Sequence, residues 1–312
     1  MKNKKIVFMG TPAIAASILE KLIKNEYNVI LVVTQPDKQK DRKGNLLFTK
    51  TKEVAVNNNI EVLQLTNIKE EYPSILEYGP DIIITCAYGQ IIPQQLIDYP
   101  EYGCINVHGS VLPKLRGGAP IHHAIIDGYD KTGITIMYMD KGMDSGDIIS
   151  TKEIPILDSD NLDSLYEKMT NLGSELLLDT LPSIFNKTNN RIKQDESQVT
   201  FGLNITKEEE KIDFNRSARD IFNQIRGLSS VPGAYCFLDN KRLKIFKSEI
   251  INKEYKETPG TIVKVEVDGF IVSTKDYGIK ILDIQLEGKK RCLVSEYFNG
   301  IKKEMLVSKE LK

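Results

Sequence analysis

Short, almost wholly apolar runs in the first half of the chain restrict its fold more than any other feature. Residues 5–9, 82–86 and 104–107 each contain apolar side chains without alternating polar ones. Strands of this kind are buried on both faces, as in a parallel sheet covered by helices. Between the first two strands, residues 13–24 carry apolar side chains at helical spacing. The pattern predicts an α/β fold with a Rossmann-like, mostly parallel sheet.

Ligands of such open sheets bind beyond the carboxyl ends of the strands. Gly10 follows the first strand, and residues 35–37 and 88–90 follow two later ones. No Gly-x-Gly-x-x-Gly or P-loop sequence follows Gly10, so the glycine is expected to serve the turn itself. We therefore expect no nucleotide cofactor.

Asn106 lies within the strand predicted at 104–107, and His108 follows it directly. Because strand residues two apart face the same side, their amide and imidazole point in one direction. Together they can move a proton and stabilise an oxyanion. This pair suggests acyl transfer more than hydride or phosphoryl transfer.

Three aspartates lie in the glycine-flanked loop 140–147. One of them is expected to hold the His108 imidazole, since a nearby carboxylate favours the imidazolium and orients the ring. Asp144 is our choice, although spacing alone does not rank it above Asp140 or Asp147. The loop lacks the ligand spacing and closing glutamate of an EF-hand, so we expect no metal.

The four cysteines form no Cys-x-x-Cys pair, which predicts reduced thiols. No signal peptide or membrane-length apolar run is present, so a cytoplasmic protein without membrane contact is expected. His122 and His123 are adjacent on a predicted helix, where neighbouring side chains diverge by about 100 degrees. They are expected to be structural.

The second half differs in pattern from the first. Residues 186–205 are polar and irregular, and five or six short strands follow them. We predict a catalytic domain over 1–185, a linker over 186–205 and a small OB-like β-barrel over 206–312. From residue 208 onward there are 20 Lys and Arg against 17 Asp and Glu. This mild excess permits RNA contact, but a solvated surface fits equally well.

The loop at 35–47 is long for a strand-to-helix connection and dense in charge. It is either a solvated loop or a mobile basic arm that meets a phosphate-rich partner.

Residues 104–120 and 135–147 resemble the folate-dependent formyltransferases. Residues 32–37 also fit that family, and residues 224–228 and 232–234 extend the resemblance into the C-terminal domain. Two sites depart from the family pattern. Ala13 and Ile14 replace an acidic and an aromatic residue, and Val231 replaces a tryptophan.

The resemblance implies 10-formyltetrahydrofolate as donor and the α-amino group of methionine on initiator tRNA as acceptor. It implies catalysis by Asn106, His108 and Asp144, tRNA contact through Arg42 and Lys43, and no obligate protein partner. The implied folate-binding residues are Tyr88, Gln90, Ile91, Ile92, Ser110, Val111, Leu112 and Pro113. A sugar-nucleotide N-formyltransferase is the alternative, since such enzymes share the three catalytic residues.

Overall fold

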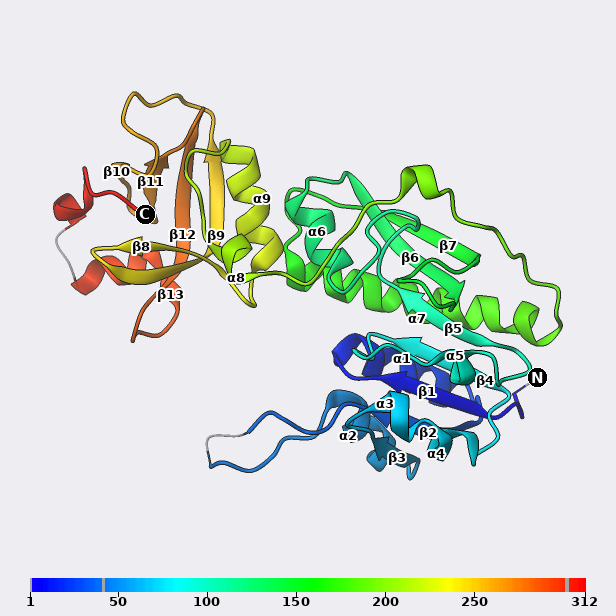
Figure 1. The fold of residues 1–312 in the computed structure, drawn as a ribbon. Coiled ribbons are helices and arrows are strands. Elements are labelled where there is room, and N and C mark those ends of the chain that lie inside the picture. Colours follow the sequence, from blue (N-terminus) through cyan, green and yellow to red (C-terminus); the bar gives the residue numbers. More distant parts are fainter. Residues whose placement is uncertain (1, 41–42, 301–302) are drawn as a thin grey trace. The chain divides into compact units, whose positions relative to one another are not determined.

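A computed structural model describes residues 2–40, 43–300 and 303–312. The chain divides into two compact units (Figure 1). The first comprises Met1–Pro120, Thr132–Ile154 and Tyr166–Leu203, and the second comprises Ile121–Lys131, Pro155–Leu165 and Asn204–Lys312.

The first unit is built on a seven-stranded sheet of order β3-β2-β1-β4-β5-β6-β7. Strands β1 to β5 run parallel, and β6 runs antiparallel to β5. The predicted Rossmann-like, mostly parallel sheet is therefore confirmed. The strands are β1 (Ile6–Gly10), β2 (Val29–Thr34), β3 (Glu61–Gln64), β4 (Ile82–Cys86), β5 (Cys104–His108), β6 (Lys131–Tyr138) and β7 (Ile148–Pro155).

Helices α1 to α6 lie between these strands in the sequence, and α7 follows β7. They are α1 (Ala13–Lys24), α2 (Lys50–Asn57), α3 (Ile68–Glu71), α4 (Pro73–Leu76), α5 (Gln94–Ile97), α6 (Pro120–Ile126) and α7 (Leu162–Phe185). Gly10 makes the tight turn into α1. A Cβ atom at this position would lie 2.8 Å from the Cys86 carbonyl oxygen and 2.6 Å from the Cβ of Ala15. Gly10 thus serves the turn, as the sequence predicts.

The stretch 191–203, within the predicted linker, packs onto the first unit. Thr200 accepts hydrogen bonds from the backbone N–H groups of Leu115 and Arg116, through its hydroxyl and its carbonyl. Gly202 donates to the Arg116 carbonyl and accepts from the Ala119 N–H. These bonds hold residues 191–203 against the loop that follows β5, and we call this segment the strap.

The second unit contains an antiparallel sheet of order β10-β11-β12-β9-β8, with β13 on β12. The C-terminal residues bridge its two edges. Lys312 exchanges backbone hydrogen bonds with Phe237 on β8, and Ile262 on β10 bonds to Ser308 and Lys309. The tail thereby closes the sheet, which confirms the expected small barrel. Its elements are α8 (Lys207–Glu210), α9 (Ala218–Leu228), β8 (Ala234–Leu238), β9 (Lys241–Ile251), β10 (Ile262–Val265), β11 (Phe270–Ser273), β12 (Gly278–Leu286), β13 (Cys292–Leu293) and α10 (Val294–Tyr297).

The cysteines are free thiols, as predicted, and Cys86, Cys104 and Cys236 are buried. Burial raises the pKa of the Cys86 thiol to about 12, which keeps it protonated and unreactive. Over the described ranges, no helix is both long and apolar enough to cross a membrane.

Candidate active site

The carboxyl end of β5 and the loop after β6 bring three predicted catalytic residues together. The Nδ2 atom of Asn106 lies 3.4 Å from Oδ1 of Asp144, and Nδ1 of His108 lies 3.6 Å from Oδ2 of the same carboxylate. His108 is only 5% exposed. In this water-poor setting, electrostatic interactions among the three side chains are stronger than on the surface.

The loop geometry separates Asp144 from the two other aspartates. Asp140 accepts hydrogen bonds from the Gly142 N–H and the Ser145 hydroxyl within its own loop. Asp147 accepts from Nε of Arg191 at 3.0 Å. Of the three carboxylates, Asp144 therefore faces the imidazole, as the sequence analysis chose.

The orientation of the His108 ring has a source that the sequence did not suggest. Its Nε2 atom lies 3.1 Å from the carbonyl oxygen of Leu115. A carbonyl only accepts, so Nε2 carries the hydrogen, and in the neutral ring Nδ1 is left as the acceptor. The 3.6 Å distance from Nδ1 to Asp144 exceeds hydrogen-bond length. Leu115 thus aligns the ring, and Asp144 acts on it electrostatically.

Thr85 orients the Asn106 amide. This buried residue lies opposite Asn106 in the parallel pairing of β4 and β5, and its hydroxyl is 2.9 Å from Oδ1 of Asn106. With the amide oxygen turned toward Thr85, the NH2 group faces Asp144. Sequence reasoning missed Thr85. A lone hydroxyl within the apolar run at 82–86 was the available signal.

Asp144 is held on several sides. The Gly117 N–H donates to Oδ2 at 2.9 Å, and Nε2 of Gln194 donates to the backbone carbonyl of Asp144 at 2.8 Å. Asp144 itself has a left-handed backbone, with φ at +48°. Gly117 has φ at +122°, and a Cβ there would lie 2.8 Å from the Gly202 carbonyl oxygen. Glycine is therefore required where the strap crosses this loop.

The predicted folate segment Ser110, Val111, Leu112 and Pro113 forms a tight turn after β5. The Ser110 hydroxyl donates to the Lys114 carbonyl at 2.6 Å. Thr135 on β6 donates to the Ser110 carbonyl and accepts from the Leu112 N–H. Both Ser110 and Leu112 are buried. Their polar groups shape the turn from within.

The second predicted folate segment follows β4. Gln90 uses both ends of its side-chain amide to hold another turn, donating to the Leu65 carbonyl and accepting from the Ile68 N–H. Tyr88 and Ile92 are buried, whereas Ile91 is 75% exposed. Ile91 is thus the member of this segment that presents an apolar side chain at the surface.

A cavity of about 460 Å³ has Gly103 and Cys104, at the amino end of β5, and Met139 in its wall, and its lining includes none of the three catalytic candidates. Cys104 shares a strand face with Asn106. The Met139 sulfur lies 3.4 Å from the Thr85 hydroxyl that orients Asn106.

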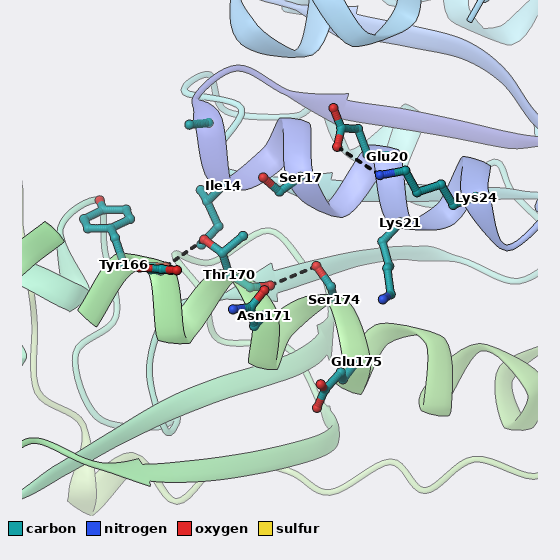
Figure 2. Close-up of a pocket in the computed structure, with 12 residues that line it drawn as sticks. Ile14, Ser17, Glu20, Lys21, Lys24, Tyr166, Thr170, Asn171, Ser174 and Glu175 are labelled. Carbon is teal, nitrogen blue, oxygen red and sulfur yellow. Dashed lines mark hydrogen bonds and ion pairs between the residues drawn. The ribbon is translucent and has the colours of Figure 1, made fainter. Parts of the chain in front are cut away.

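A second cavity, of about 500 Å³, lies between α1 and α7. Figure 2 shows side chains of the two helices facing each other across it. The hydroxyls of Thr170 and Ser174 donate to carbonyls of their own helix, and Lys24 pairs with Glu20. Its lining includes none of the three catalytic candidates, and these polar groups already have partners within the helices.

The charged loop after β2 is anchored at its base. Burial raises the pKa of Asp37, but hydrogen bonds from Lys52, Gln64 and the Thr49 N–H outweigh this and lower it below its usual range. Lys52 Nζ lies 2.5 Å from the carboxylate. Farther along the loop, Lys43 is exposed, and Arg42 lies outside the described residues. In the parts of the chain that the structure describes, no group of three or more His, Cys, Asp and Glu side chains could hold a metal ion.

Comparison with known proteins identifies the family of this chain. Residues 4–181 match the formyl transferase family, and residues 204–302 match the formyl transferase C-terminal domain. A methionyl-tRNA formyltransferase of Malacoplasma penetrans (strain HF-2) is 45% identical over 299 residues, which cover 96% of this chain and 94% of that protein.

Two solved structures share the fold. HypX from Aquifex aeolicus in complex with tetrahydrofolic acid has a TM-score of 0.67 and 16% identity over 96% of this chain, which spans 47% of HypX. WlaRD, a sugar 3N-formyl transferase in the presence of dTDP and 5-N-formyl-THF, has a TM-score of 0.65 and 24% identity over 92% of this chain and 99% of WlaRD. By its relatives and by both of its domains, the chain belongs to the methionyl-tRNA formyltransferase family.

Proposed function

We propose that the chain transfers the formyl group of 10-formyltetrahydrofolate to the α-amino group of methionyl initiator tRNA, in the cytoplasm, for translation initiation. The single observation that carries the chemistry is the convergence of Asn106, His108 and Asp144 at the end of β5. Relatives that are named methionyl-tRNA formyltransferase, and that match this chain over nearly its full length, support the choice of acceptor.

The reaction needs a hydrogen-bond donor that stabilises an oxyanion, and a path along which one proton can move. The neutral amine of methionine forms a bond to the formyl carbon, the bond from that carbon to N10 of the folate breaks, and the amine proton moves to N10. Both the carbonyl oxygen and the leaving nitrogen gain charge on the way. Preorganised N–H donors in a partly dry site stabilise such charge.

Asn106 supplies the first donor. Thr85 holds its Oδ1, so the NH2 group is turned toward the reacting region. His108 supplies the second donor through Nδ1 when protonated, since Nε2 is committed to Leu115. The Asp144 carboxylate lies 3.6 Å from Nδ1 and faces the positive charge that the ring bears when this atom holds a proton. In the neutral ring, Nδ1 is instead the acceptor: it can take the proton from the attacking amine, directly or through a water, and pass it to N10 of the leaving folate.

For the folate we propose the surface formed by Ser110–Pro113, by Tyr88, Gln90, Ile91 and Ile92, and by Met139. The exposed apolar side chain of Ile91 supports this placement. A pterin ring is flat and largely apolar on its faces, which suits such walls.

For the tRNA we propose the loop after β2, through Arg42 and Lys43. Leu46, Leu47 and Phe48, which follow in the same loop, are exposed and add apolar surface. A combination of cations and an aromatic ring suits single-stranded nucleic acid such as an acceptor end. The barrel and its basic residues are proposed to add phosphate contacts.

Formyl transfer from 10-formyltetrahydrofolate, measured with methionyl initiator tRNA and separately with a dTDP-linked amino sugar, tests the proposal. Transfer to the tRNA alone is expected. Transfer to the sugar alone would retain the catalytic chemistry and reject the tRNA acceptor. No transfer to either acceptor would reject the function.

A further inference from the structure

The strap at 191–203 contacts both loops that surround His108. The side chain of Gln194 forms hydrogen bonds with each of these loops. Nε2 of Gln194 donates to the backbone carbonyls of Asp144 and Gly146, both at 2.8 Å. Its Oε1 accepts from Nε and Nη2 of Arg116, at 3.0 and 2.8 Å. One amide therefore links the loop that carries Asp144 to the loop that carries Leu115.

The hydrogen-bond partners of Gln194 fix the direction of its side-chain amide. Arg116 only donates hydrogen bonds, so the oxygen of Gln194 must face it and the NH2 group must face the carbonyls. Arg116 is 5% exposed, and its guanidinium also binds the Glu196 carboxylate, at 2.8 Å. The Glu196 side chain is 72% exposed and therefore sits on the outside of this arrangement.

The two linked loops hold the two groups that face the imidazole. Leu115 supplies the carbonyl for Nε2 of His108, and Asp144 supplies the carboxylate opposite Nδ1. The Gly117 N–H, next to Arg116, binds that same carboxylate. A shift of the Asp144 backbone would change the distance from its carboxylate to Nδ1 without removing any catalytic side chain.

We infer that Gln194 is a positioning residue for formyl transfer: it holds the Asp144 loop against the Leu115 loop so that His108 keeps its geometry. This inference rests on the proposed function. It assigns a role at the site to a residue outside the strand and the loop that carry the three catalytic side chains. Misplacement of a reacting group by about 1 Å can cost about 100-fold in rate.

The substitution Gln194→Glu separates positioning from simple packing. A glutamate keeps the acceptor for Arg116, as an ion pair, but it removes both N–H donors and faces two carbonyls with a carboxylate. A packing role predicts unchanged activity, whereas the positioning role predicts a kcat about 10- to 100-fold lower with an unchanged KM for methionyl-tRNA. Gln194→Met, of similar length, repeats the test if the glutamate variant does not fold.

Glu196→Gln is the matched control. It removes a charge from the other partner of Arg116 and leaves the bonds to Asp144 and Gly146 intact. As a substitution at an exposed side chain, it should change kcat by less than about twofold. An equal loss in both variants would assign the effect to Arg116 and overturn the role of Gln194.

Amide hydrogen exchange gives a readout that does not depend on activity. Peptides covering 114–118 and 140–147 should exchange faster in Gln194→Glu than in wild type or Glu196→Gln, because the two loops are no longer joined. Unchanged exchange, or faster exchange with unchanged kcat, would overturn the inference. A wild-type protein that transfers no formyl group would instead reject the proposed function, and the exchange result would still decide whether Gln194 holds the loops.

Discussion

Nε2 of His108 lies 3.1 Å from the carbonyl oxygen of Leu115, and this contact sets the direction of the ring. Leu115 reaches its place with a left-handed backbone, φ +57°, and its N–H is bound by the Thr200 hydroxyl. Nδ1 is therefore the ring nitrogen that remains for the proposed reaction. The catalytic ring depends on a backbone carbonyl from one side and on the Asp144 carboxylate from the other.

Thr85→Val should lower kcat about tenfold, because the Asn106 amide loses the hydroxyl that fixes its oxygen. Valine has nearly the same shape, so the buried packing of β4 is retained. Thr85→Ser keeps the hydroxyl and should restore most of the rate. Steady-state kcat for the three proteins, with their thermal unfolding midpoints, checks this. Equal rates for the valine and serine variants would show that Thr85 has no part in orienting Asn106.

Asp37→Asn should raise the KM for methionyl-tRNA about 3- to 10-fold and leave the KM for the folate unchanged. The Asp37 carboxylate binds Lys52, Gln64 and the Thr49 N–H at the base of the loop, and charged hydrogen bonds are worth about 1.5–3 kcal/mol each. Loosening the base should make the loop tip less ordered. Glu53→Gln, on the exposed surface of α2, is the control. If Asp37→Asn left both KM values unchanged, the loop would have no role in tRNA binding.

His122 should make the protein less stable in acid. Burial, with a smaller contribution from His123, lowers the pKa of His122 to about 4. In the unfolded chain the group titrates near 6.5, so below that pH the unfolded state takes up a proton that the folded state does not. The contribution of the neutral His122 ring to the free energy of unfolding is therefore complete above pH ~6.5. It falls by up to ~3 kcal/mol as the pH drops toward 4.

The variant His122→Gln removes this titration. Thermal unfolding midpoints measured from pH 7.5 to 4.5 should therefore fall more steeply for the wild type than for the variant. Parallel curves would contradict the low pKa of His122.

The sequence predicted the parts of this molecule that depend on local pattern. Non-alternating apolar strands gave the parallel sheet, and the spacing of Asn106 and His108 placed both on one face of β5. The resemblance to formyltransferases supplied Asp144. Each of these signals resides in a short stretch of chain.

What the sequence did not predict arises from contacts between distant stretches. Leu115 aligns His108 through a backbone atom, which carries no residue-type signal. Gln194 lies 50 residues from Asp144 and falls in a polar segment whose composition is that of a linker. The C-terminal tail that closes the barrel is likewise visible only through its backbone hydrogen bonds to Phe237 and Ile262.

The most direct test of the account is the rate of formyl transfer to methionyl initiator tRNA by His108→Ala, with 10-formyltetrahydrofolate binding measured on the same protein. His123→Gln serves as the control, because it changes a histidine of the second unit. The account predicts a loss of about 100- to 10,000-fold in kcat, with folate affinity close to that of the wild type. A His108→Ala enzyme that retained near-normal kcat would contradict the assignment of the imidazole to the reaction.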